Sequence, residues 1–218
     1  MHRVKQLASA MIVGSVLFSA GFGLTLAQSS TDSVDYSPNP DQCNQAPRTI
    51  EEVEALQASA TPGSGADTSA PEGFELPAGE EASSDVRGGI VETIVQFFAC
   101  ANGGDLLASY GSVTDSMFAA LVASGVLGDD PASISASPVA VPEEAQAQLL
   151  DTREFTQYDD GRVGVLVYFR EPSGESGVEE PVRIELWIFA QEDGRWLVDE
   201  MVTGLEAQLG DMATPPAG

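Results

Sequence analysis

The apolar residues of this chain change their spacing partway along it. From Val86 to Ala101 they recur three and four residues apart, which is the period of a helix with one buried face. Further along they alternate with a period of two, in four runs at Leu150–Tyr158, Arg162–Glu171, Val182–Gln191 and Arg195–Val202. Gly161 and Gly194 each follow an aspartate between two such runs, which is typical of hairpins. Helices followed by antiparallel hairpins predict an α+β domain, placed at residues 86–204, with a C-terminal tail at 205–218.

Polar residues and glycines mark the predicted helix ends. Ser83, Ser84 or Asp85 caps the long helix, and Asn102-Gly103-Gly104 ends it. A further turn begins at Asp105 and runs through Tyr110. A third helix ends at Gly125 and is capped by one of two neighbouring residues, Thr114 or Asp115.

The third strand run is apolar on both of its sides. Ile184, Leu186 and Ile188 would face one way, whereas Trp187 and Phe189 would face the other. A sheet with one wet face should instead alternate apolar and polar residues. The helices can cover one face. We expect the other to be covered by a partner copy, which would make a homodimer through the sheet, or by an N-terminal arm at Cys43–Leu56.

Residues 1–27 have the pattern of a signal peptide. A positively charged start precedes an apolar run from Leu7 to Leu26. Small residues at Thr25 and Ala27 predict cleavage after Ala27 and therefore a secreted or extracytoplasmic protein. The alternative is an uncleaved membrane anchor, because the run approaches the ~20 residues that a spanning helix needs.

The two cysteines, Cys43 and Cys100, form an even pair in a chain expected to meet an oxidising compartment, which predicts a disulfide. It would tether an N-terminal arm, residues 28–56, that contains a short helix at 48–56. In that helix Thr49 and Glu52 match a capping box, followed by an apolar stripe. Residues 57–85 are rich in Gly, Pro and Ser and predict a flexible linker.

Composition excludes several kinds of chemistry. The single histidine, His2, and the single lysine, Lys5, lie in the predicted leader, so the exported part could use neither as a catalytic base, metal ligand or Schiff-base amine. Of nine basic residues, two lie in that leader, which leaves seven arginines against 34 acidic residues. This balance disfavours nucleic acid and, after cleavage, a membrane surface as partners.

No metal or cofactor is expected either. Acidic pairs occur at Asp129-Asp130, Glu143-Glu144 and Glu179-Glu180. None of them has the regular spacing of a calcium-binding loop. We interpret them as solvated surface.

Two segments resemble the nuclear transport factor 2-like superfamily. Phe97–Asp105 is similar to the end of that family's first helix, and Thr114–Phe118 lies where its Thr-Asp-capped helix would begin. Asp193–Glu200 resembles its final hairpin, in which a tryptophan follows the turn. The resemblance covers about half of the chain. It implies helices packed in the concave face of a curved antiparallel sheet, a cystatin-like cone with an apolar interior, as in SnoaL-like cyclases and ketosteroid isomerase.

Family members with and without catalysis share this cone, so the fold leaves the function open. We expect a non-catalytic domain whose pocket binds a small apolar ligand. The alternatives are an isomerase or cyclase that uses carboxylates and tyrosines, and a protein-interaction module. The pocket candidates, none of them assigned a catalytic role, are Tyr110, Asp115, Tyr168, Glu185 and Trp187. Glu185 shares a strand face with Trp187, and such a carboxyl could have a raised pKa.

Overall fold

A computed structural model describes residues 38–59, 68–125, 138–171 and 181–209. The predicted signal peptide and the first residues of the arm, up to residue 37, lie outside this range. Within the described residues no helix combines the length and the apolar character needed to cross a membrane.

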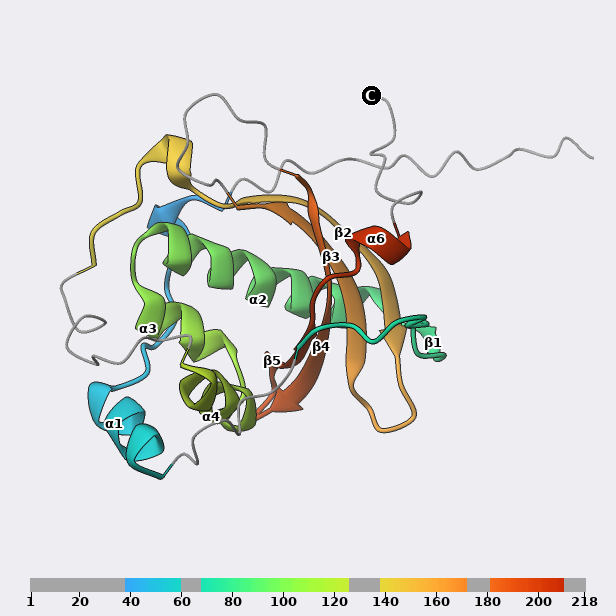
Figure 1. The fold of residues 1–218 in the computed structure, drawn as a ribbon, viewed down its shortest axis with the longest axis horizontal. Coiled ribbons are helices and arrows are strands. Elements are labelled where there is room, and N and C mark those ends of the chain that lie inside the picture. Colours follow the sequence, from blue (N-terminus) through green and yellow to red (C-terminus); the bar gives the residue numbers. More distant parts are fainter. Residues whose placement is uncertain (1–37, 60–67, 126–137, 172–180, 210–218) are drawn as a thin grey trace, which may run out of the picture. The chain divides into compact units, whose positions relative to one another are not determined.

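A five-stranded antiparallel sheet forms one half of the structure (Figure 1). Neighbours along the chain are neighbours in the sheet, in the order β1-β2-β3-β4-β5. The strands are β1 (Glu80–Glu81), β2 (Gln148–Gln157), β3 (Val163–Arg170), β4 (Arg183–Glu192) and β5 (Arg195–Val202). The α+β class is therefore confirmed. The four predicted strands appear with shifts of two residues or fewer at their ends, whereas β1 was not predicted.

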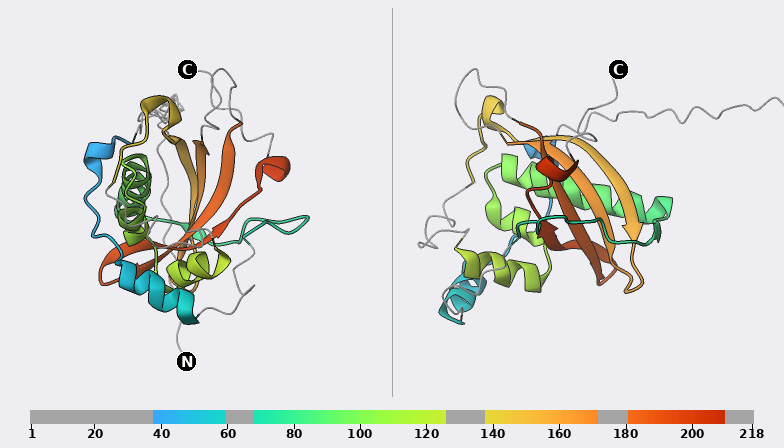
Figure 2. Two further views of the ribbon diagram at one scale, coloured as in Figure 1. Left: turned by 60° about the vertical axis from the view of Figure 1, so that its left-hand side comes forward. Right: turned by 45° about the vertical axis from the view of Figure 1, so that its right-hand side comes forward.

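The turns and bulges of the sheet follow from local sequence. Gly161, Asp193 and Gly194 have positive φ angles of 87°, 50° and 79°, as the tight hairpin turns require. The pairing of β2 with β3 shifts register between Arg153 and Thr156, where Glu154 has a φ of 54°. Such bulges bend a strand. The sheet is visibly curved in Figures 1 and 2.

The helices begin and end close to the predicted signals. They are α1 (Ile50–Ser59), α2 (Ser84–Asn102), α3 (Leu106–Ser109), α4 (Asp115–Ser124) and α6 (Glu206–Leu209), with short 3-10 turns η1 (Pro40–Gln42), η2 (Tyr110–Ser112) and η3 (Glu143–Ala145). Ser83 caps α2, Asp105 caps α3, and Thr114 rather than Asp115 caps α4 by accepting a hydrogen bond from Met117 N at 3.1 Å. Gly125 ends α4 with a left-handed φ of 76°.

The main core lies between α2 and the inner face of the sheet. Ile90, Ile94 and Phe98 on α2 pack with the odd-numbered side chains of β3 and β4, including Val165 and Trp187. Residues from α4 complete this core. Figure 2 shows α2 on one side of the sheet and α6 on the other.

A second core lies on the outer face of the sheet, and other segments of the same chain cover it. Leu166, Ile184 and Leu186 are buried there against Phe74 and Leu205. Ala70 and Leu76, from the predicted linker, and Leu209 on α6 also pack on this cluster. The two-sided burial of β4 is thus confirmed. The cover, however, comes from two segments that were predicted as a flexible linker and a C-terminal tail.

The predicted linker differs from expectation where the structure describes it. Residues 57–59 extend α1, and residues 60–67 lie outside the described range. From residue 68 onward the segment pairs with the sheet: Ser69 forms a parallel bridge with Thr203, and β1 pairs with β2. Its few apolar residues suffice because each one packs on an apolar sheet face that would otherwise contact water.

The arm is fastened to the helices, not to the outer face of the sheet. The predicted disulfide is confirmed: Cys43 and Cys100 are bonded, with their Cα atoms 4.6 Å apart. The Thr49–Glu52 capping box is also present. Val53 of α1 is fully buried in the main core, on the side of α4. The suggestion that the arm covers the second sheet face was therefore wrong.

Removing the disulfide should destabilise the protein without changing its fold. The bridge closes a loop with a sequence separation of 57, for which the chain-entropy model gives about 4 kcal/mol. We expect Cys100→Ser to lower the free energy of unfolding by up to that amount in urea titrations. Wild-type protein in reductant is the matched control and should lose a similar amount. Equal unfolding free energies with and without the bridge would contradict this.

The cap of α4 gives a second stability prediction. Thr114 is 1% exposed, and its hydroxyl both caps the helix and donates to Asp199 at 3.0 Å, whereas Asp115 is exposed. Thr114→Ala should therefore cost about 1 kcal/mol or more of unfolding free energy. Asp115→Asn should cost less, because an exposed ion pair contributes little. Urea unfolding of both variants tests this ranking, and a larger loss in Asp115→Asn would reverse it.

Candidate functional site

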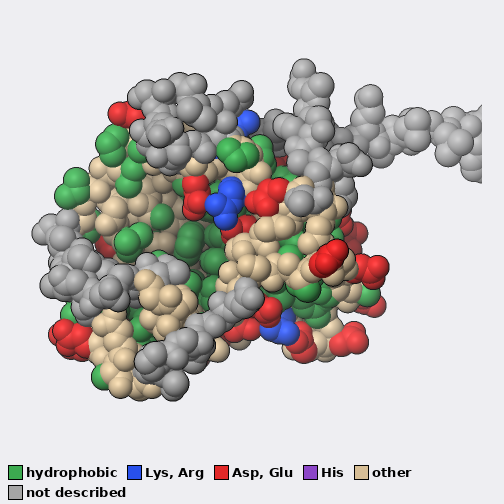
Figure 3. Space-filling view, in the orientation of Figure 1, with side chains coloured by type: hydrophobic (Ala, Val, Ile, Leu, Met, Phe, Trp, Pro, Cys, Tyr) green, Lys and Arg blue, Asp and Glu red, His purple; other side chains and the backbone are tan. Residues whose placement is uncertain are grey.

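A pocket of about 380 Å³ lies between the helices and the inner face of the sheet. Apolar side chains line most of it, and Figure 3 shows hydrophobic groups at the bottom of a hollow on this side of the molecule. Its described lining residues come from α2, η2, α4, three strands and the segments next to them: Thr68, Phe97, Phe98, Tyr110, Met117, Ala120, Leu121, Ser124, Phe169, Glu171, Glu185, Trp187, Met201 and Thr203.

Aromatic rings form one wall of the pocket. Trp187 on β4 packs parallel to Phe98, with ring centroids 5.6 Å apart and an interplanar angle of 11°. Phe97 meets Trp187 edge-to-face at 5.0 Å, and Phe169 lies 5.3 Å from Phe98. These rings pack against one another and form an aromatic wall of the pocket.

Glu185 is the buried acid of the pocket. It lies on the inner face of β4, two residues before Trp187, and is only 6% exposed. Its Oε2 accepts a hydrogen bond from Trp187 Nε1 at 2.9 Å. Burial raises the pKa of Glu185 above its ordinary value, although this hydrogen bond and the nearby Arg183 act in the opposite direction.

A single arginine, Arg183, lies close to three carboxylates, one of which is that of Glu185. Arg183 lies 3.5 Å from Glu185 Oε1, 3.4 Å from Glu171 Oε2 and 3.6 Å from Glu206 Oε1. Glu206 also accepts a hydrogen bond from Ile184 N at 3.2 Å, which joins α6 to β4. The cluster therefore holds three acidic groups and one basic group, and its net charge is negative when all are ionised.

The segment that follows the undescribed residues 60–67 forms part of the pocket rim. Thr68 O accepts hydrogen bonds from Thr203 N at 2.7 Å and from its hydroxyl at 3.3 Å. Ala70 N donates to Thr203 O at 2.9 Å. Thr68 and Thr203 both line the pocket, so this pairing fixes one side of the entrance.

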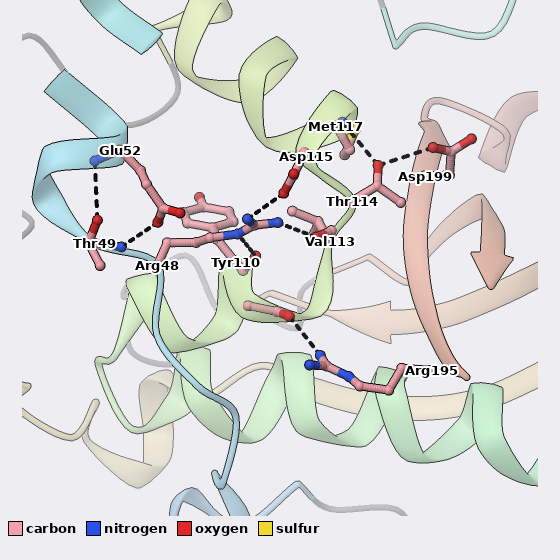
Figure 4. Close-up of polar contacts among 11 residues, drawn as sticks. Arg48, Thr49, Glu52, Tyr110, Val113, Thr114, Asp115, Met117, Arg195 and Asp199 are labelled. Carbon is pink, nitrogen blue, oxygen red and sulfur yellow. Dashed lines mark hydrogen bonds and ion pairs between the residues drawn. The ribbon is translucent and has the colours of Figure 1, made fainter. Parts of the chain in front are cut away.

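The arm holds the helical wall through Arg48 (Figure 4). The Arg48 guanidinium donates to Tyr110 O at 3.2 Å, to Val113 O at 2.7 Å and to Asp115 Oδ1 at 2.6 Å. It also lies 5.0 Å from the centre of the Phe118 ring. One side chain thus joins η2, the loop after it and α4, which together carry a wall of the pocket.

A second arginine, Arg195, joins the arm to η2. Arg195 on β5 donates to Gly111 O and to Gln45 Oε1, each at 3.1 Å, and Figure 4 shows its approach to η2. The arm passes so close to Gly111 that an added Cβ there would stand 2.2 Å from Ala46 O. Only glycine fits at this crossing.

Three of the five predicted pocket residues line the pocket: Tyr110, Glu185 and Trp187. Burial also raises the pKa of Tyr110. Asp115 is exposed and pairs with Arg48 outside the pocket. Tyr168 lies on the outer face, where the guanidinium of Arg153 stands 4.7 Å from its ring centre, so its placement in the pocket was wrong. Tyr168 and Glu185 lie on opposite sheet faces, because Glu185 pairs with Val167 rather than with Tyr168.

Several lining residues were not predicted. Phe169 and Glu171 share the parity of Val167 on β3, so the strand alternation contained the signal for both. Phe98 belongs to the predicted buried face of the long helix but was not named as a pocket residue, and Phe97 was noted only as part of a motif. Thr68 could not have been found, because it lies within the predicted linker.

The described residues contain no group of three or more Asp, Glu, His or Cys side chains arranged to hold a metal ion. Glu143 and Glu144 lie in η3, whereas the other two acidic pairs lie outside the described range. Comparison of the chain with protein-family models, with curated proteins and with solved structures finds no match.

The raised pKa of Glu185 predicts a pH-dependent stability. The folded state binds the Glu185 proton more tightly than the unfolded state does. Protonated Glu185 therefore contributes most to the free energy of unfolding below its ordinary pKa of 4.5. That contribution falls as pH rises through the pKa of the folded state. Glu185→Gln does not ionise. The unfolding free energy of this variant should therefore rise relative to that of wild type as pH increases from about 4 to about 8.

Urea unfolding of both proteins across this pH range measures the difference. Glu54→Gln, on the exposed side of α1, is the matched control for the loss of one negative charge. A difference between Glu185→Gln and wild type that stays constant with pH would show that Glu185 ionises as readily in the folded state as in the unfolded chain.

Proposed function

We propose that this chain is an exported, non-catalytic domain whose pocket binds a small apolar ligand. The observation that carries the proposal is the pocket itself, about 380 Å³ and lined mostly by aromatic and aliphatic side chains. This size and lining are typical of small-molecule sites, in which a few polar groups fix orientation. Here those groups are Glu185 and the hydroxyls of Thr68 and Thr203.

We further propose that the domain is a nuclear transport factor 2-like cone. Support comes from the order of elements and from the motifs that suggested the family. Phe97–Asp105 spans the end of α2 and the start of α3, and Thr114 caps α4. Asp193–Glu200 forms the turn and most of β5. A curved sheet whose inner face packs on α2 is the arrangement that such a cone requires.

Export is part of the proposal. The Cys43–Cys100 bridge supports an extracytoplasmic location, because disulfides persist mainly in oxidising compartments. Cleavage after Ala27 would release the protein, and an uncleaved leader would instead keep it at the membrane. Either way the pocket would lie outside the cytoplasm.

Contacts of Glu185 favour binding over proton transfer. Its Oε2 is occupied by Trp187 Nε1, and its Oε1 faces Arg183. A general base needs a free oxygen within hydrogen-bonding reach of the substrate proton. Self-association through the outer sheet face is also less favoured, because Phe74 and Leu205 of the same chain already pack on that face.

A pocket-filling variant tests binding. The neutral fluorescent probe N-phenyl-1-naphthylamine should bind the wild-type chain saturably, one per molecule, with increased emission. In Ala120→Phe, a benzyl group on α4 occupies the space that the ligand needs, so we expect affinity to fall at least about tenfold.

The matched control is Ala55→Phe, which adds the same group on the exposed side of α1. It should bind like wild type. Saturable binding that survives Ala120→Phe unchanged would place the probe elsewhere and overturn the proposal. Absence of saturable binding in the wild type would also overturn it.

A further inference from the structure

The chemistry of the pocket lining narrows the class of ligand. Five aromatic residues line the pocket: Phe97, Phe98, Tyr110, Phe169 and Trp187. Among its described lining residues, the ionisable acids are Glu171 and Glu185, and none is basic. Aromatic faces next to a carboxylate, without a competing cation in the wall, form an environment that attracts positive charge.

The three acids beside the pocket are not fully neutralised by the protein. Arg183 is the basic partner shared by Glu171, Glu185 and Glu206, and it is 42% exposed. Glu185 is the deepest of the three, since its side chain is 8% exposed against 60% for Glu171. A buried carboxylate with a shared counter-ion gains the most from a further positive group.

We propose that the pocket selects apolar molecules that carry a positively charged nitrogen, and that Glu185 is the specificity-determining residue. This inference rests on the proposed ligand-binding function. The apolar part of such a ligand would contact Phe98, Trp187 and Leu121, and its nitrogen would lie beside the carboxylate at the aromatic wall. Anionic amphiphiles such as fatty acids are excluded, because their carboxylate would be buried next to Glu185, and the nearest basic group, Arg183, is already shared by three carboxylates.

Three probes of similar shape distinguish the contribution of charge to the binding affinity from that of apolar contact. Benzyltrimethylammonium is a cation, neopentylbenzene is its neutral carbon isostere, and phenylmethanesulfonate is an anion of similar outline. Each competes with N-phenyl-1-naphthylamine for the mature chain at about 0.15 M salt, where attraction to the acidic surface is screened beyond ~8 Å. We expect the cation to bind at least about tenfold more tightly than the isostere, and the anion to bind most weakly.

Glu185→Gln should bring the affinity for the cation to that for the isostere, while the isostere binds as it does to wild type. Retained isostere binding shows that the variant pocket is intact. Glu171→Gln should reduce the ratio of cation affinity to isostere affinity less than Glu185→Gln does, because Glu171 is more exposed. Glu54→Gln, far from the lining residues in sequence and absent from the lining, should leave the advantage unchanged.

A pH series provides a readout that does not need a variant. Affinity for the quaternary cation should rise as Glu185 loses its proton, because the ionised carboxylate binds it better, whereas affinity for the isostere should not rise. The charged and titratable groups around Glu185 are Arg183, Glu171, Glu206 and Tyr110.

The outcomes distinguish this inference from the function on which it rests. If the isostere displaces the probe as well as or better than the cation, the pocket binds apolar ligands but the charge preference is wrong. If the anion binds best, the inference is likewise overturned. If no competitor displaces the probe and the probe itself does not bind saturably, both the inference and the proposed function fall.

Discussion

The structure depends on the burial of both faces of β3 and β4. Seven of the eight residues of β3 are buried, as are six consecutive residues of β4. Burying apolar surface is the main driving force of folding, so each face requires a cover of its own. Helices α2 and α4 cover the inner face, whereas two segments at either end of the domain cover the outer one.

The helices leave part of the inner face uncovered, and the pocket occupies that space beside α4 and η2. The arm contacts several of the elements that border this space. Arg48 links η2 to α4, the disulfide links the arm to α2, and Arg195 links it to β5. Gln96 adds a buried contact, since its Oε1 accepts from Asn44 N at 2.9 Å. Together these contacts join the arm to α2, η2, α4 and β5, the elements that surround the pocket.

Patterns with a strong local cause could be predicted from the sequence. The periodicity of α2, the Asp-Gly hairpin at Gly194 and the capping box at Thr49 depend on neighbouring residues, and all three are present. Pairings between distant residues were harder. Tyr168 was named as a pocket candidate although it lies on the outer face, because the register of β3 against β4 cannot be read from either strand alone.

The prediction of a flexible linker at residues 57–85 was wrong for a related reason. Ala70, Phe74 and Leu76 form too sparse a pattern to predict order, and they are ordered by a sheet face formed more than 80 residues later in the chain. The pocket shows both what could and what could not be predicted. Trp187 and Glu185 could be recognised as residues on the same face of one strand. Thr68 lines the pocket, and Arg48 holds its helical wall, only through tertiary contacts.

Both cysteines precede every residue of β2 in the chain, which sets the order of folding events in a chain that enters an oxidising compartment N-terminus first. A chain that emerges from its N-terminus presents Cys43 and Cys100 while the strands that will bury α2 are still missing. An oxidant can therefore join the arm to α2 on an unfinished molecule. The later strands then meet a helix whose outer side is already occupied, which leaves its apolar face as the surface on which the sheet assembles.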